Sequence, residues 1–262
     1  MNRRTFLKAV PAAIAAAAAS RFAMPGETLA SPPALDAGKA PASAPETAPA
    51  SRPIGDLKPI DLLKPQKDGG KSVLAALQER KTTRTITDER LPPQMLSNLL
   101  WAAFGVNREK GPAGGIGRTA ASASNSQEID VYVALAEGVY LYEAVPHRLT
   151  PVVAGDLRAK VGRGRGGAGA KAPVRLIYVA DIAKFAKARF QEPGLKDAEI
   201  QKSYYNIGAG LIAGNVYLFA ASQGLAAWFH NCDKPGLAKE LGLGADQRVL
   251  YGHTVGYPAK EA

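Results

Sequence analysis

The chain has 262 residues, a formal net charge of +10 and a single cysteine, Cys232. One cysteine excludes an internal disulfide, and the sequence lacks a Cys/His cluster with the spacing of metal ligands, so we expect no metal site. The basic surplus fits a phosphate-bearing ligand or a solvated surface. Because the arginines are not interleaved with aromatic residues in a basic block, we do not expect nucleic acid as a partner.

The N-terminus has a recognisable leader pattern. Arg3 and Arg4 precede the sequence TFLK and a weakly hydrophobic, alanine-rich run at residues 9–19. This pattern resembles a twin-arginine export signal, which directs folded proteins across a membrane. The resemblance implies the twin-arginine export machinery as a partner and a periplasmic or otherwise exported location; an ordinary secretory leader is the alternative. Cleavage after Ser20 or Ala30 fits the sequence, and the run is too short for a permanent membrane anchor, since hydrocarbon is about 30 Å thick.

Composition divides the chain into three parts. We assign residues 1–30 to the export signal. Alanine, proline and serine dominate the sequence that follows, with few large apolar residues to drive collapse, so we expect a disordered linker at residues 31–69. Residues 70–262 are then long enough for a single domain with a substantial core.

Two helices are expected at the start of this domain. Apolar residues at helical spacing predict a short helix over residues 72–80, with Ser72 as its candidate cap. Pro92 and Pro93 predict the start of a second helix, in which leucines recur at helical spacing as far as Phe104.

Strands are predicted further along the chain. Residues 129–135 and 139–142 flank a Glu-Gly turn and predict a hairpin. The continuous apolar run at residues 174–179 is typical of a buried strand, and residues 249–255 predict a closing strand.

The longest signal is the uncharged stretch at residues 203–232. Its asparagine, serine, glutamine and histidine side chains argue against a membrane span and favour a buried Gly/Ala-rich helix over residues 204–223. Gly210 and Gly214 are four residues apart and would let another backbone approach, so we expect this helix at the heart of the fold or of a dimer. Helices and strands do not alternate regularly, which favours the α+β class.

Three separate segments carry side chains suited to binding a cofactor. Arg80, Thr82 and Arg84 suit a phosphate monoester, because guanidinium groups and hydroxyls are good donors to phosphate. A charge cluster at the end of a helix is the alternative interpretation.

The second segment is Ser122–Gln127, directly before a predicted strand. The amide of Asn125 offers a donor and an acceptor, as the uracil-like edge of a flavin requires, and a polar turn is the alternative. In the third segment, residues 224–230, a tight turn precedes backbone amides and an aromatic side chain able to face a planar ring. Its alternative is a core strand.

In order and spacing these segments resemble the nitroreductase-like FMN oxidoreductase family, over roughly residues 74–258. Residues 138–142 with His147, Arg148 and Leu149 look like the SagB-type branch, whose members include dehydrogenases that oxidise peptide azolines to azoles. The other matching elements are the Arg80/Thr82/Arg84 segment, residues 99–105, Ser122–Gln127, the helix that contains Asn215 with the Gly224-Leu225 turn, and residues 256–258.

The resemblance implies an α+β, nitroreductase-like fold, with a central antiparallel or mixed sheet flanked by helices, in an intertwined homodimer with FMN at the interface. Arg80, Thr82 and Arg84 would hold the phosphate and ribityl end, with Lys260 as a second phosphate contact. Ser122 and Asn125 would meet the pyrimidine side of the ring from the other subunit. Backbone groups of Ala227, Trp228 and Phe229 would lie near the flavin N5.

The implied function is an exported, FMN-dependent oxidoreductase that transfers two electrons through flavin N5 to or from a small-molecule or quinone-like substrate. Lys202 and Tyr204 are the nearest equivalent of the Lys-Tyr pair of azoline-oxidising relatives, and the intervening Ser203 argues against azole formation. The three histidines are expected to be structural. The alternatives are an inert flavin-binding or partner-binding module on the same fold, and a basic surface-binding protein.

Overall fold

The computed structural model describes residues 54–111, 114–162 and 172–260, all of which belong to one compact unit that spans residues 47–262. The expected export signal, both candidate cleavage sites and the first part of the expected linker lie outside the described residues.

A seven-stranded sheet forms the centre of this unit, and every neighbouring pair of strands in it is antiparallel. The α+β prediction with a central antiparallel sheet is therefore confirmed. A separate two-stranded ribbon is made by β2 (Val106–Arg108) and β3 (Gly117–Arg118). In spatial order the strands of the large sheet are β1 (Ile60–Asp61), β6 (Arg148–Ala154), β5 (Gly138–Glu143), β4 (Ile129–Ala134), β7 (Val174–Asp181), β9 (Gln247–Gly256) and β8 (Ala226–His230).

The predicted strands are present. The β4–β5 hairpin closes through a hydrogen bond of 2.9 Å from the Leu135 N–H to the Gly138 carbonyl. β7 lies inside the sheet and both of its faces are covered, which explains its unbroken apolar sequence. β6 was not predicted as a strand, because Pro151 interrupts it and its residues are mostly half-buried.

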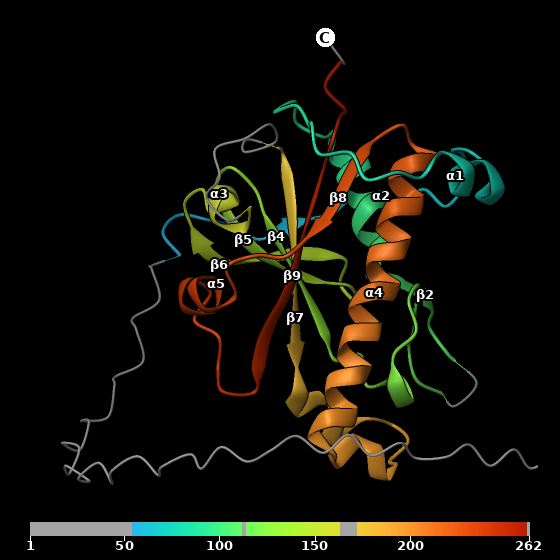
Figure 1. The fold of residues 1–262 in the computed structure, drawn as a ribbon, viewed down its shortest axis with the longest axis vertical. Helices are drawn as coiled ribbons and strands as arrows, with labels where there is room; N and C mark the ends of the chain where they lie inside the picture. Colours follow the sequence, from blue (N-terminus) through green and yellow to red (C-terminus); the bar gives the residue numbers. More distant parts are fainter. Residues whose placement is uncertain (1–53, 112–113, 163–171, 261–262) are drawn as a thin grey trace, which may run out of the picture. The chain divides into compact units, whose positions relative to one another are not determined.

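The described part of the chain contains five helices, of which α1 packs against α4 and the other four cover the sheet: α1 (Val73–Glu79), α2 (Pro93–Phe104), α3 (Arg158–Val161), α4 (Ala198–Ser222) and α5 (Lys234–Glu240). Figure 1 shows α2 and α4 on one side of the sheet and α3 and α5 on the other. Side chains alternate along a strand, so each strand supplies both layers. Leu176 and Tyr178 of β7 pack towards α2 and α4, whereas Ile177 and Val179 pack towards α3 and α5.

The two N-terminal helices follow the prediction closely. The hydroxyl of Ser72 caps α1 by accepting a hydrogen bond from the Ala75 N–H. α2 has Pro93 as its first residue, where the missing N–H costs nothing, and ends before Gly105.

The long helix α4 differs from the prediction in length and in burial. It begins at Ala198, because the carboxylate of Asp197 accepts hydrogen bonds from the N–H groups of Glu199 and Ile200. One face is buried, but Ile207 is 58% exposed and Leu211 is 45% exposed. Among the described residues there is no helix that is long and apolar enough to cross a membrane.

The glycines of α4 also differ from expectation. A Cβ at Gly210 or Gly214 would meet nothing within 4 Å, so these residues lie on an open face of the described chain. The close contact is made at Gly208 instead, where a Cβ would lie 2.7 Å from Oε1 of Glu128. Gly208 therefore lets α4 pack against the start of β4.

The predicted boundary at residue 70 is wrong, because the segment before it is part of the fold. Ile60 and Asp61 pair with β6, and the Leu62 N–H donates to the His147 carbonyl over 3.1 Å. The hydroxyl of Ser97 in α2 donates to the Leu63 carbonyl over 2.5 Å. These few apolar residues are enough to attach a segment whose composition indicated disorder.

Candidate functional site

The Arg80/Thr82/Arg84 segment runs in an extended conformation along the outer edge of β8. The Thr83 N–H donates to the Ala227 carbonyl over 3.0 Å. Further along, the Thr87 N–H donates to the Tyr257 carbonyl, and the Ala259 N–H donates to the Thr85 carbonyl. The segment is thus held between β8 and the residues that follow β9, which explains how positions far apart in the sequence form one site.

Both arginines of this segment are exposed, and both lie over aromatic rings. The guanidinium carbon of Arg80 is 5.4 Å from the ring centre of Tyr217, and that of Arg84 is 5.7 Å from Trp228. Neither guanidinium has an acidic partner among the described residues. The guanidinium groups of Arg80 and Arg84 and the hydroxyl of Thr82 therefore form a group of hydrogen-bond donors suited to a phosphate.

Tyr217 in α4 joins the parts of this site, and the sequence analysis missed it. Its phenol oxygen lies 2.9 Å from the hydroxyl of Thr82 and accepts a hydrogen bond of 2.9 Å from the Phe229 N–H. One side chain therefore connects the helix, the arginine-bearing segment and β8. The contact spans 135 residues of sequence, so local spacing contains no sign of it.

A pocket of about 560 Å³ lies beside the same segment. It is lined by Lys81, Thr83 and Thr85, together with Ala227 and Lys260. Because successive side chains of an extended chain point to opposite sides, the residues lining this pocket alternate with Arg80, Thr82 and Arg84. The structure therefore brings Lys260 next to the Arg80/Thr82/Arg84 segment, on the side where Lys81, Thr83 and Thr85 point.

The aromatic residues of β8 lie on opposite faces of the sheet. The Phe229 ring packs 4.8 Å from Tyr251 and 5.6 Å from His253, while the Trp228 ring packs 4.6 Å from His230. The two rings cannot face one planar cofactor together. The Ala227 carbonyl and the Phe229 N–H are already hydrogen-bonded to Thr83 and Tyr217.

The Ser122–Gln127 segment forms a polar turn, around the short 3-10 helix η1 (Ala123–Asn125). The Ser122 hydroxyl accepts from the Gln127 N–H over 3.0 Å, and the Asn125 amide donates to the Ile116 carbonyl over 3.2 Å. Asn125 and Gln127 adopt left-handed backbone conformations, with φ of 53° and 52°. The pocket beside this turn is lined by none of Arg80, Thr82 and Arg84 among the described residues.

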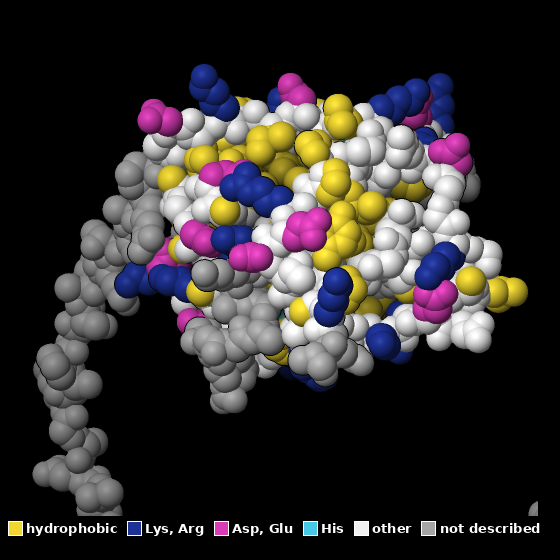
Figure 2. Space-filling model, turned by 90° about the horizontal axis from the view of Figure 1, so that it is seen from above, with side chains coloured by type: hydrophobic (Ala, Val, Ile, Leu, Met, Phe, Trp, Pro, Cys, Tyr) yellow, Lys and Arg dark blue, Asp and Glu magenta, His cyan; other side chains and the backbone are white. Residues whose placement is uncertain are grey.

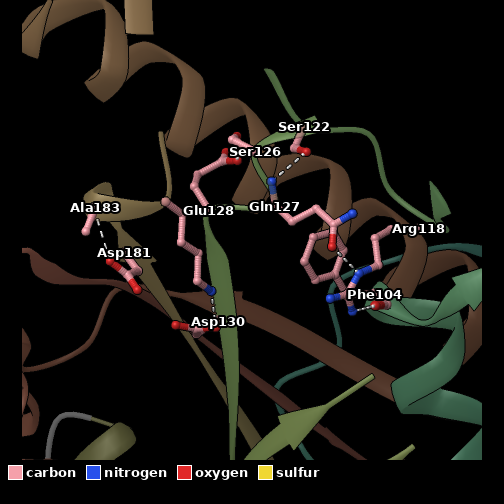
Figure 3. A network of polar contacts seen from close by, with 10 residues as sticks. Phe104, Arg118, Ser122, Ser126, Gln127, Glu128, Asp130, Asp181 and Ala183 are labelled. Atoms are coloured by element: carbon pink, nitrogen blue, oxygen red, sulfur yellow. Dashed lines mark hydrogen bonds and ion pairs between the residues drawn. The ribbon is translucent and has the colours of Figure 1, made fainter. Parts of the chain in front are cut away.

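Arg118 orders this turn, as Figure 3 shows, and was also missed. Its Nε donates to the side-chain oxygen of Gln127 over 2.8 Å, and its Nη1 donates to the Phe104 carbonyl over 3.0 Å. The guanidinium carbon lies 4.9 Å from the ring centre of Phe104, and burial lowers the pKa of Arg118.

Two carboxyl groups, one buried and one partly buried, follow the turn at the start of β4. Glu128 is fully buried, accepts a hydrogen bond of 2.7 Å from the Ser126 hydroxyl, and burial raises the pKa of its carboxyl group. Asp130, which is labelled in Figure 3, forms an ion pair of 2.5 Å with Lys184. Glu128 and Asp130 hold the start of β4 in place through these contacts, and neither lines the 560 Å³ pocket or the pocket beside the Ser122–Gln127 turn.

The histidines are held in structural hydrogen bonds. Nδ1 of His253 lies 2.9 Å from the Tyr178 hydroxyl, and burial lowers the pKa of His253 to about 3. Burial also raises the pKa of Tyr178, so the phenol stays protonated beside the neutral imidazole. Nε2 of His230 lies 2.9 Å from the Thr254 hydroxyl, and Nε2 of His147 lies 2.8 Å from the Ser97 hydroxyl.

The structure places Lys202 and Tyr204, the nearest equivalent of the Lys-Tyr pair and the candidates for a catalytic role, away from these pockets. The side chain of Lys202 is 59% exposed and lies 3.7 Å from the Glu199 carboxylate. The Tyr204 ring packs 6.4 Å from the ring of Phe185. Neither residue lines the 560 Å³ pocket or the pocket beside the Ser122–Gln127 turn.

Comparison with known proteins identifies the class of protein that this fold and site define. Residues 77–257 match the model of the Nitroreductase family. The chain belongs to the nitroreductase family, whose members are oxidoreductases.

Individual relatives agree with this assignment. A Methanocaldococcus jannaschii protein named as a nitroreductase is 29% identical over 161 residues, which are 57% of this chain and 73% of the relative. A Ralstonia eutropha JMP134 structure described as a nitroreductase is 33% identical, with a TM-score of 0.68 over 81% of this chain and 95% of the other. An Escherichia coli microcin synthetase complex has a similar fold at 18% identity, with a TM-score of 0.57 and 70% of each chain covered.

Proposed function

We propose that this protein is an FMN-dependent oxidoreductase that exchanges two electrons with a small-molecule or quinone-like substrate. The observation that carries the proposal is the Arg80/Thr82/Arg84 segment, in which two exposed guanidinium groups without an acidic partner among the described residues flank a positioned hydroxyl. In a chain of the nitroreductase family, this is the arrangement expected for the phosphate end of the cofactor.

The residues present fit that cofactor. Arg80 and Arg84 supply charge for the phosphate, and Lys260 lies in the neighbouring pocket. Tyr217 holds the Thr82 hydroxyl in place, so the polar end of the site is ordered in advance. FMN, when bound, supplies the two-electron chemistry, and the protein positions it and excludes water.

We propose that the working form is a homodimer. Ile207, Gly210, Leu211 and Gly214 recur at helical spacing on the open face of α4, where apolar side chains and two glycines meet solvent. On α1, Leu74 is 78% exposed. Seen from above the end of the molecule where α1 lies, Figure 2 shows apolar side chains exposed between charged ones. A second subunit covering this surface would also bring its own Ser122–Gln127 turn to the flavin.

We further propose that the protein is exported after folding. The support is the paired arginines and alanine-rich run at the N-terminus. FMN would then be bound in the cytoplasm before export. Because NAD(P)H is scarce outside the cytoplasm, the reducing agent would be a quinol or another donor.

Within the family, the SagB-like features at residues 138–149 support a relation to that branch but not its azole-forming activity. The Lys-Tyr pair is interrupted by Ser203, and Lys202 lies in solvent at the start of α4. We therefore propose a different dehydrogenase or reductase activity on the same fold.

The test is FMN binding followed by flavin turnover. Wild-type protein should take up FMN, and the Arg80→Gln/Arg84→Gln double variant should bind it at least tenfold more weakly, since about 1.4 kcal/mol corresponds to a factor of ten. Arg90→Gln, which removes an exposed arginine outside this segment, is the matched control. Reduced holoprotein should be reoxidised by nitroaromatics or quinones faster than free reduced FMN. Reoxidation at the rate of free FMN would favour the inert flavin-binding module.

A further inference from the structure

A second pocket, of about 440 Å³, lies beside the Ser122–Gln127 turn, and its chemistry differs from that of the 560 Å³ pocket. It is formed where the β2–β3 ribbon meets this turn and the residues that follow the short helix η2 (Ile182–Lys187). Its side chains include Arg108, Arg118, Ser122, Asn125, Arg189 and Phe190.

Positive charge dominates this pocket. Three arginines line it, and the residues of its described wall include no aspartate or glutamate. The guanidinium of Arg118 is hydrogen-bonded to the Gln127 side chain and the Phe104 carbonyl. Arg108 and Arg189 are exposed and form no ion pair or hydrogen bond through their side chains with other described residues. Two guanidinium groups are therefore left for an anion.

Glycines make room for these two arginines along the pocket wall. A Cβ at Gly117 would lie 2.6 Å from Nε and 2.7 Å from Nη2 of Arg108. A Cβ at Gly114 would lie 3.0 Å from Nη2 of Arg189. The Arg108 guanidinium thus lies against the ribbon at Gly117, and the Arg189 guanidinium lies close to Gly114, because these two residues lack side chains.

The remaining wall suits a flat molecule. Phe190 is 53% exposed, which is unusual for a large aromatic ring, and it lines the pocket next to Arg189. On the turn, Ser122 and Asn125 are fixed by hydrogen bonds to the Gln127 N–H and the Ile116 carbonyl, so the polar wall is rigid.

We propose that this pocket selects a planar, conjugated small molecule that carries a carboxylate or a comparable anionic group, bound through Arg108 and Arg189 with its ring against Phe190. The inference rests on the proposed function, because the Ser122–Gln127 turn is expected to border the flavin ring of the neighbouring subunit. The two arginines would then make the enzyme specific for anionic substrates.

The test uses FMN-loaded, oxidised protein and two probes of similar shape, 4-nitrobenzoate and the neutral 4-nitrobenzamide. Isothermal titration at about 0.15 M salt, where the Debye length is about 8 Å, measures direct binding. We expect 4-nitrobenzoate to bind at least tenfold more tightly than 4-nitrobenzamide. In Arg108→Gln/Arg189→Gln this preference should fall to less than twofold with FMN content unchanged.

The matched control is Lys187→Gln, which removes one positive charge at the end of η2 without touching the pocket, and it should keep the preference. Equal binding of both probes to the wild-type protein would overturn the inference. So would a double variant that keeps the preference or that loses FMN, since the arginines would then serve another role. FMN content is measured first, so failure of the wild-type protein to take up FMN is recognised separately as a failure of the proposed function and, with it, of the substrate role.

Discussion

The phenol oxygen of Tyr217 lies 2.9 Å from the hydroxyl of Thr82. The same oxygen accepts a hydrogen bond from the backbone of β8 at Phe229, so three elements meet at one atom. The predicted phosphate-binding segment is therefore anchored to the long helix rather than left as a free strand. This arrangement links the order of the site to the packing of α4.

Tyr217→Phe should weaken FMN binding and lower stability. The change removes one oxygen, leaves the Phe229 N–H without its acceptor and releases Thr82, at a cost of about 1 kcal/mol in the free energy of unfolding. FMN affinity should fall by about fivefold to tenfold. Urea unfolding and a flavin titration measure the two effects.

The control for this prediction is Tyr251→Phe. Its hydroxyl bonds to the Asn206 side chain over 3.0 Å, away from the phosphate segment, so FMN affinity should stay unchanged. Equal FMN affinities of wild-type protein and Tyr217→Phe would show that Tyr217 does not order the site.

Leu211→Asp should dissociate the proposed dimer. Leu211 lies at the centre of the open face of α4 and is 45% exposed in the single chain, so a charge there is tolerated in the monomer but not in an apolar interface. Size-exclusion chromatography with light scattering at micromolar concentration should show a dimer for the wild type and a monomer for the variant.

Val145→Asp is the control for the dimer, because Val145 is 64% exposed in the turn between β5 and β6. This variant should remain dimeric. A wild-type protein that is monomeric at these concentrations would contradict the proposed interface directly.

His253 should make stability fall as the solution becomes acidic. The unfolded chain takes up a proton near pH 6.5, whereas burial lowers the pKa of His253 in the folded protein to about 3. The contribution of His253 is therefore fully present above about pH 6.5 and is lost as pH falls towards about 3, by up to about 1.4 kcal/mol per pH unit.

His253→Asn removes the titrating group and keeps a partner for the Tyr178 hydroxyl. Urea unfolding at pH 7, 6 and 5 should give a pH dependence that is flatter than that of the wild type by roughly this slope. The comparison between the two proteins is needed because the pKa values of Glu128 and Asp130 are raised in the folded protein. Protonation of these two groups therefore increases the free energy of unfolding as pH falls, opposite to the effect of His253. Parallel curves would contradict the assignment of His253 as a buried neutral group.

Ser97→Ala should loosen the segment that precedes α1. The hydroxyl of Ser97 donates to the Leu63 carbonyl and accepts from His147, so its removal breaks both hydrogen bonds at a cost of about 1 kcal/mol. Hydrogen exchange should increase at residues 60–66. Ser203→Ala, on an exposed position of α4, should leave exchange there unchanged.

Local signals in the sequence predicted the elements that depend on local chemistry. As expected, α2 begins at Pro93 and ends at Phe104, and the Glu-Gly turn makes the β4–β5 hairpin. The start of α4 was missed, because charged residues in its first turn concealed the helix that Asp197 caps. Residues before position 70 were assigned to a linker because their composition does not reveal their partners in α2 and β6.

The site was predictable to a similar extent. The spacing of Arg80, Thr82 and Arg84 is local, and the structure keeps these residues in one segment. Their contact with Tyr217 requires the packing of α4 on β8, which no spacing in the sequence contains. Successive side chains of a strand point to opposite faces of the sheet. A firm prediction of β8 as a strand would therefore have placed the Trp228 and Phe229 rings on opposite faces.

The most direct test of the central claim is the absorbance spectrum of the protein, purified after folding in the cytoplasm and freed of unbound ligand by gel filtration. The account predicts a yellow protein with about one FMN per chain, released on denaturation as FMN, and a loss of this flavin in Arg80→Gln/Arg84→Gln. A colourless protein that also fails to take up added FMN would contradict it.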